Sequence, residues 1–134
     1  MTSKVTYLGD LRTECEHLKS NATFITDAPV DNNGKGESFS PTDTVATALA
    51  SCMLTIIGIK AKDHDLDIVG ANAAVTKTMA ADPRRISKIE VVLTFPSKYD
   101  EKQTKLIERS AETCPVLYSL HPDIELDISF KYLD

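Results

Sequence analysis

The sequence is poor in the residues that mark unstructured or repetitive proteins. Only five of its 134 residues are glycine and six are proline, and it has no internal repeat or low-complexity tract. Hydrophobic residues make up 42% and charged residues 26%, which is the balance of an ordinary soluble globular protein. A chain of this length fits one domain with little room for a second, so we expect a single domain over residues 1–134.

The chain also lacks an excess of positive charge. Its formal net charge is −5, whereas binding to the phosphates of nucleic acid normally needs a basic face, so we expect no nucleic-acid partner. The N-terminus, MTSKVTYLGD, has no charged-then-apolar leader. The longest apolar run is too short, and too rich in Ala, Thr and Ser, for a convincing membrane span. We therefore expect a cytoplasmic protein with no membrane partner.

Common motifs of catalysis and metal binding are missing as well. There is no Gly-rich phosphate loop and no Gly-x-Ser-x-Gly nucleophile elbow. The three histidines are scattered, and the one local Cys-x-His pattern, Cys15 to His17, has no second half-site. We therefore expect neither a metal nor a cofactor.

The hydrophobic pattern predicts an α+β fold. Strand-like segments lie at 5–18, 21–28, 67–79, 86–95 and 124–132, and the last is expected to be antiparallel. Helices are predicted from Pro41 to about Lys62, over 100–113, and in a short segment from Cys114. This order of elements indicates antiparallel sheets wrapped around one long buried helix.

The long helix has a clear start and an unusual surface. Ser40 is typical of an N-cap, Pro41 of the first helical position, and Asp43 complements the positive end of the helix dipole. The segment ATALASCMLTIIGI (46–59) is apolar nearly all round. Such a helix needs cover on every side, which favours a homodimer because a second subunit would supply the missing cover.

The three cysteines need an explanation other than structural disulfides, which are rare in the cytosol. Cys52 lies within the apolar run, where the alternatives are a packed core thiol and a thiolate activated by a cation from another segment. Cys114 precedes Pro115 at a helix start, a place that favours thiolate, although an ordinary cap would look the same. Cys15 is the expected spare thiol, and His121 is either a general base for Cys114 or a surface loop histidine.

Arg12 is the candidate cation for Cys52. It lies in a strand-like segment, and its permanently charged guanidinium can hold a thiolate as well as a bound oxygen. The alternative is a solvated strand residue.

Two motifs resemble the OsmC/Ohr family, the osmotically inducible protein C and organic hydroperoxide resistance proteins. SPTDTVATALASCMLTIIGIKA (40–61) carries a cysteine eleven positions after its proline, and CPV (114–116) follows at the expected place. The resemblance implies an OsmC-like fold over the whole chain and an intertwined homodimer with two active sites at the subunit interface. It also implies a thiol-dependent peroxidase in an antioxidant stress response.

The resemblance assigns a role to each candidate residue. Cys52 matches the peroxide-reacting cysteine, Cys114 the resolving cysteine, and Arg12 the early-strand arginine that activates the thiolate. A sulfenic acid at Cys52 would condense with Cys114 to a disulfide, which an external dithiol reduces. Apolar surroundings of Cys52 would favour organic hydroperoxides over hydrogen peroxide.

The chain departs from the family pattern at Thr42. The family pattern for members with strong organic-hydroperoxide activity has Pro-Glu at the helix opening, and the glutamate holds the arginine. Here the acid comes one residue later, at Asp43, and one residue is a rotation of about 100° on a helix. Whether Asp43 or another acid orients Arg12 is left open. The alternative function is a non-catalytic redox-sensing or small-ligand-binding protein on the same scaffold.

Overall fold

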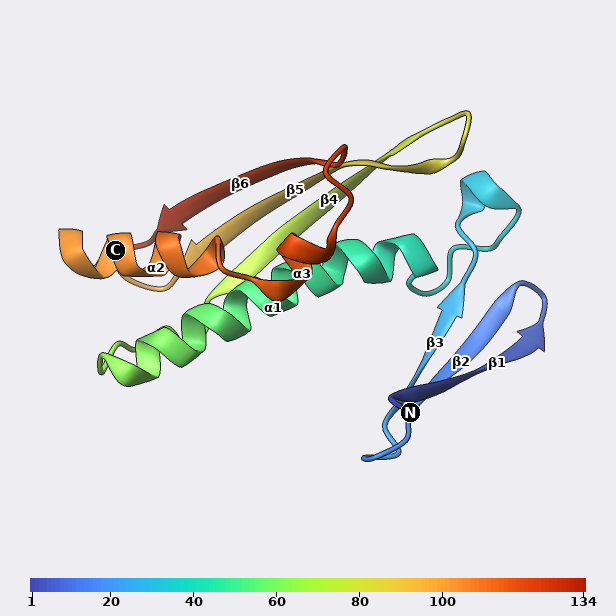
Figure 1. The fold of residues 1–134 in the computed structure, drawn as a ribbon, viewed down its shortest axis with the longest axis horizontal. Coiled ribbons are helices and arrows are strands. Elements are labelled where there is room, and N and C mark those ends of the chain that lie inside the picture. Colours follow the sequence, from blue (N-terminus) through green and yellow to red (C-terminus); the bar gives the residue numbers. More distant parts are fainter. The chain divides into compact units, whose positions relative to one another are not determined.

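The computed structural model describes residues 1–134 and contains two compact units, Met1–Val45 and Ala46–Asp134. The N-terminal unit holds β1 (Ser3–Gly9), β2 (Arg12–His17), β3 (Thr23–Asp27), the short 3-10 helix η1 (Val30–Asn32) and the first residues of α1 (Pro41–Asp63). The C-terminal unit holds the rest of α1, then β4 (Asn72–Ala80), β5 (Arg85–Phe95), α2 (Glu101–Ala111), α3 (Pro115–Ser119) and β6 (Glu125–Tyr132) (Figure 1). The α+β fold class is confirmed, while one domain over the whole chain stays a prediction.

The N-terminal sheet is antiparallel in the order β1-β2-β3. The sequence predicts one strand-like segment over 5–18, and this is wrong, because the chain turns back at Asp10 and Leu11. These two residues have φ of +53° and +63°, and they link the cross-strand partners Gly9 and Arg12. Positive φ at both central residues is the signature of a type I′ hairpin turn, which fits the twist of the flanking strands. The turn makes Arg12 the first residue of β2.

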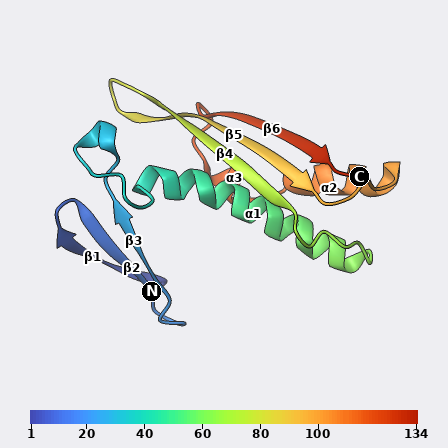
Figure 2. The same ribbon diagram turned by 180° about the vertical axis from the view of Figure 1, so that it is seen from behind.

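The C-terminal sheet has the order β4-β5-β6 and is mixed. β4 and β5 form an antiparallel hairpin, whereas β6 runs parallel to β5, so the prediction of an antiparallel last strand is wrong. The physical reason is the connection: parallel neighbours need a long crossover, usually helical, and α2 and α3 supply it. α1, α2 and α3 lie on one face of this sheet (Figures 1 and 2). Buried or half-buried residues therefore alternate with exposed ones along β4 and β6.

The start of α1 is the predicted one. The backbone N–H of Asp43 donates to Ser40 Oγ, and the backbone N–H of Ser40 donates to Asp43 Oδ2, each at 3.0 Å. This reciprocal capping box satisfies backbone donors that the helix leaves unpaired, and Pro41 takes the first helical position. The carboxylate of Asp43 thus accepts a hydrogen bond at the helix start.

One face of α1 forms the centre of the core. Its buried side chains recur every three or four residues and pack with the inner residues of β5: Ala46, Leu49, Ala50, Met53, Ile57 and Ala61 of the helix with Ile89, Val91, Leu93 and Phe95 of the strand. On the helix outside this row, Val45 is 39% and Ile59 is 53% exposed. A single chain therefore covers only one side of this apolar helix.

By length and composition alone, α1 is apolar enough to cross a membrane. A helix at the centre of a protein core meets the same two criteria, and a third of the apolar stretch of α1 is buried in its own chain.

Candidate functional site

The structure brings Cys52 and Cys114 together in the C-terminal unit. Cys114 is fully buried, its thiol donates a long hydrogen bond to the carbonyl oxygen of Leu49 (Sγ to O 3.9 Å), and it lies near enough to the side chain of Cys52 for the two thiols to influence one another. Cys52 is half-buried and packs against the core. Both cysteines are free thiols. Two residues that the sequence separates by two strands and a helix therefore form a pair.

The two cysteines of this pair are positioned by different elements. Cys52 stands in the middle of α1, next to the buried row that anchors the helix on β5. Cys114 is the N-cap of α3, with Pro115 at the first helical position, as the sequence predicts. Proline there fits because a first-turn N–H has no helical partner to lose. The crossover from β5 to β6 thus delivers the second thiol to the middle of α1.

The prediction that Cys114 favours the thiolate is wrong. Burial raises the pKa of the Cys114 thiol, and the hydrogen bond with Cys52 and the charge of Cys52 raise it further. The backbone N–H groups of Leu117 and Val116 lower the pKa by less, and none of them makes a capping hydrogen bond of normal geometry. Burial therefore disfavours the thiolate of Cys114, although Cys114 stands at a helix start.

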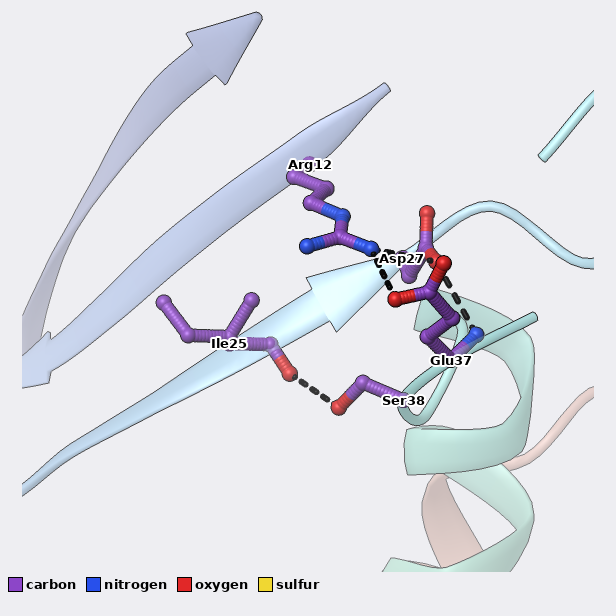
Figure 3. A network of polar contacts seen from close by, with 5 residues as sticks. All are labelled: Arg12, Ile25, Asp27, Glu37 and Ser38. Atoms are coloured by element: carbon purple, nitrogen blue, oxygen red, sulfur yellow. Dashed lines mark hydrogen bonds and ion pairs between the residues drawn. The ribbon is translucent and has the colours of Figure 1, made fainter. Parts of the chain in front are cut away.

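Arg12 lies in the N-terminal unit, and both cysteines of the pair lie in the C-terminal unit. Its Nη2 donates to Glu37 Oε2 at 2.8 Å and to Asp27 Oδ2 at 3.5 Å (Figure 3). The pKa of Arg12 is raised above its ordinary value, first by the hydrogen bond to Glu37 and then by the charge of Asp27. Sequence reasoning missed both acids.

A signal for Asp27 was nonetheless present in the sequence. In the hairpin of β2 and β3, which the segment between His17 and Thr23 connects, Arg12 faces Asp27 across the strands. Opposite charges at such positions attract one another. Glu37 lies in a loop, where no pattern of spacing predicts its partner.

The other candidate residues lie outside the thiol pair. Cys15 is half-buried in β2, where its Sγ lies 3.9 Å from Thr13 Oγ1. His121 is an exposed loop residue whose Nδ1 accepts the backbone N–H of Asp123 at 3.0 Å, so of its two alternatives the surface histidine is the one observed. No group of three or more His, Cys, Asp or Glu side chains is arranged to hold a metal ion.

A cavity of about 590 Å³ lies between the end of α1 and α2. Four of its ten lining residues are Lys or Arg, and neither cysteine of the pair is among them: Lys60, His64, Asp100, Lys102, Gln103, Lys105, Leu106, Arg109, Ser110 and Thr113. The cavity and the thiols are therefore separate features of the C-terminal unit.

Comparison with known protein families agrees with the fold and with the thiol pair. The family model of OsmC-like proteins matches residues 34–129, which include α1, Cys52 and Cys114. The chain belongs to the OsmC family. No curated protein matches it.

Solved structures of OsmC relatives share the fold of this OsmC protein. A Psychrobacter arcticus protein, named for osmotic stress and a detoxification response, is 60% identical over 97% of this chain and 95% of its own, with a TM-score of 0.94. An organic hydroperoxide resistance protein OsmC from Legionella pneumophila is 14% identical, with coverage of 98% and 97% and a TM-score of 0.76. A Vibrio cholerae protein named for organic hydroperoxide resistance, with captopril bound in one active site, is 15% identical, with coverage of 99% and 93% and a TM-score of 0.75.

Proposed function

We propose that this OsmC protein is a thiol-dependent peroxidase that reduces organic hydroperoxides. The observation that carries the proposal is the pair of neighbouring free thiols, Cys52 on α1 and Cys114 at the start of α3. Membership of the OsmC family supports a redox role, as do fold relatives named for organic hydroperoxide resistance.

The reaction uses the two thiols in sequence. The Cys52 thiolate attacks one oxygen of the hydroperoxide, the O–O bond breaks, and the alkoxide leaves and takes up a proton to become the alcohol, while Cys52 is oxidised to sulfenic acid. Cys114 then attacks the sulfenic sulfur; its thiol proton leaves with the hydroxyl group as water, and a Cys52–Cys114 disulfide forms. An external dithiol reduces this disulfide by exchange and is itself oxidised to a disulfide.

The protonation of Cys114 suits the order of these steps. Only a thiolate is a strong nucleophile, so a thiol that keeps its proton does not compete with Cys52 for the peroxide. Cys114 is also buried among apolar side chains, which disfavour a second negative charge beside the first. The same apolar surroundings stabilise the bound alkyl group of an organic hydroperoxide by about 25 cal/mol for each Å² of apolar area that is buried.

The test is peroxide consumption by purified variants with a dithiol reductant. We expect Cys52→Ser to abolish consumption, and Cys114→Ser to allow about one turnover per chain before the sulfenate overoxidises. Cys15→Ser, the matched control, should keep the wild-type rate. An unchanged rate in Cys52→Ser would reject the proposal.

A second function is favoured by one specific observation, the threonine at position 42. Without a glutamate at the helix opening, the protein could act as a redox sensor or bind a small apolar or thiol-bearing ligand, and captopril in the Vibrio cholerae relative is such a thiol. One equivalent of hydroperoxide should then oxidise two thiols per chain without further turnover, across several hydroperoxides and dithiols. Sustained turnover excludes this alternative.

We also propose that the protein works as a homodimer in the cytoplasm. Two surfaces support the dimer: the uncovered side of α1 and a row of apolar residues on the N-terminal sheet. Val5, Cys15 and Phe24 are successive cross-strand partners, and Val5 and Phe24 are 59% and 50% exposed. Exposed apolar surfaces of this kind mark sites of association.

A further inference from the structure

The guanidinium of Arg12 is held through one nitrogen only. Nη2 contacts both Glu37 and Asp27, whereas Nη1 and Nε make no hydrogen bond within the chain (Figure 3). Arginine carries five N–H donors in a rigid fork. One end of the fork is therefore fixed by acids, and the donors on the other two nitrogens are available to an anion.

The two acids that fix Nη2 differ in burial and in support. Asp27 is fully buried at the end of β3, faces Arg12 across the sheet, and accepts the backbone N–H of Glu37 at 3.0 Å. The side chain of Glu37 is 58% exposed and lies in the loop before α1. An exposed ion pair is weak and screened by salt, whereas a buried, sheet-held carboxylate is not free to move away.

A third observation concerns the other oxygen of Asp27. Oδ1 is buried and has no hydrogen-bond partner. A buried carboxylate with an unsatisfied oxygen is costly unless a cation compensates it. Arg12 is the cation paired with it, so Asp27 and Arg12 depend on each other.

From these observations we propose that Asp27 is the positioning residue for Arg12 and that Glu37 is a second, releasable partner. The arginine of this chain would then be oriented by acids from β3 and its following loop, in place of an acid at the helix opening. The inference rests on the proposed function in one respect, because its test uses the expectation from the sequence that an Arg12 guanidinium, of the same chain or of the second subunit, stabilises the Cys52 thiolate.

The direction in which Asp27→Asn shifts thiolate formation at Cys52 distinguishes a positioning role of Asp27 from a simple effect of its charge. Asp27→Asn removes a negative charge, and loss of a negative charge by itself makes thiolate formation easier. If Asp27 instead keeps Arg12 in place, the same change releases the cation and makes thiolate formation harder. The two explanations therefore predict shifts in opposite directions.

The experiment compares Asp27→Asn, Glu37→Gln and the control Glu14→Gln, which removes an exposed charge from β2, the strand that carries Arg12. The rate of Cys52 alkylation is measured against pH by peptide mass spectrometry. We expect Asp27→Asn to move the midpoint to higher pH and to lower kcat/KM for a hydroperoxide about tenfold. Glu37→Gln should change kcat/KM less than about threefold, within the range of an exposed pair, and Glu14→Gln should change neither quantity. A midpoint in Asp27→Asn that is unmoved, or moved to lower pH, would overturn the inference.

A second measurement keeps the proposal testable if Asp27→Asn does not fold. In Glu37→Gln, nitrogen NMR of the arginine side chains should still show slow rotation about the Arg12 Nε–Cζ bond, because Asp27 still holds Nη2. Fast rotation in this variant would contradict the anchor role. If the wild-type protein consumes no peroxide, the proposed function fails, but the alkylation profile and the NMR experiment still decide the role of Asp27.

Discussion

At the level of single residues, the thiols of the pair are chemically unequal. Cys114 is fully buried, and its pKa is raised, whereas Cys52 is half-buried on a helix whose far side is uncovered by its own chain. A helix start favours thiolate, but burial opposes it, and at Cys114 burial is the larger effect. The different roles that we propose for the two cysteines therefore agree with their surroundings.

The raised pKa of Cys114 predicts how stability depends on pH. Above the ordinary thiol pKa of about 8.5, the unfolded chain has lost this proton while the folded chain keeps it. The folded state then binds more protons, so the free energy of unfolding falls as pH rises through that range. Guanidinium unfolding between pH 7 and pH 10 should show this decline in the wild type and less of it in Cys114→Ser. The half-buried Cys15 provides the comparison: Cys15→Ser should keep the wild-type decline, and equal slopes in all three proteins would contradict the explanation.

The sequence identified some site residues better than others. Cys52 and Cys114 could be found because each lies in a motif with a fixed distance to a proline. The acids beside Arg12 could not be found in this way, because Asp27 reaches it across a sheet and Glu37 from a loop. The protonation of Cys114 also depends on burial by residues far away in sequence, which local spacing does not report.

At the level of elements, the starts of the two longer helices follow directly from local sequence. Ser40 and Asp43 close a capping box on α1, and Asp100 and Gln103 do the same on α2. Such caps depend on residues three positions apart, so they can be recognised without knowledge of the fold. The cap on α1 is also relevant to the site, because α1 carries Cys52.

Removal of the Ser40 cap should destabilise the protein. In Ser40→Ala the backbone N–H of Asp43 loses its acceptor, and we expect the free energy of unfolding to fall by about 1 kcal/mol in chemical denaturation. Ser51→Ala, at an exposed position within the same helix, is the matched control and should be neutral or slightly stabilising. An equal effect of the two substitutions would show that the cap contributes nothing.

The two errors in the predicted elements have different causes. The turn at Asp10 and Leu11 was missed because leucine is an unusual residue at positive φ, although Gly9 and Asp10 are ordinary turn residues. The direction of β6 was wrong because alternation of hydrophobic residues indicates a strand but not its partner or its direction. That direction follows from the path of α2 and α3, which is a property of the assembled unit.

At the level of the whole molecule, a single chain leaves apolar surface uncovered on both of its units. The side of α1 away from β5 and the row Val5, Cys15 and Phe24 on the N-terminal sheet are two examples. The sequence predicts this for α1, because its apolar residues surround the helix. The apolar row on the sheet becomes visible only when the register of three strands is known.

The proposed homodimer gives a direct prediction of mass. Light scattering after size exclusion should find twice the 14.7 kDa of one chain. Phe24→Glu places a charge in the apolar row and should shift the protein towards the monomer, because burying an unpaired charge at an interface is costly. Thr23→Glu, the neighbouring exposed residue on the opposite face of β3, should leave the dimer intact. A monomeric wild type would refute the dimer.

The parallel pairing of β6 with β5 has a mechanical consequence for the thiol pair. Cys114 does not lie on a strand; it lies at the join between α2 and α3, midway along the crossover. A Cys52–Cys114 disulfide would require the two sulfurs to approach to a bond length of about 2.05 Å. A five-residue helix and its preceding turn can make that movement while both flanking strands keep their ladder. In the proposed reaction, the segment that moves is therefore one short turn, and the strands of the sheet keep their positions.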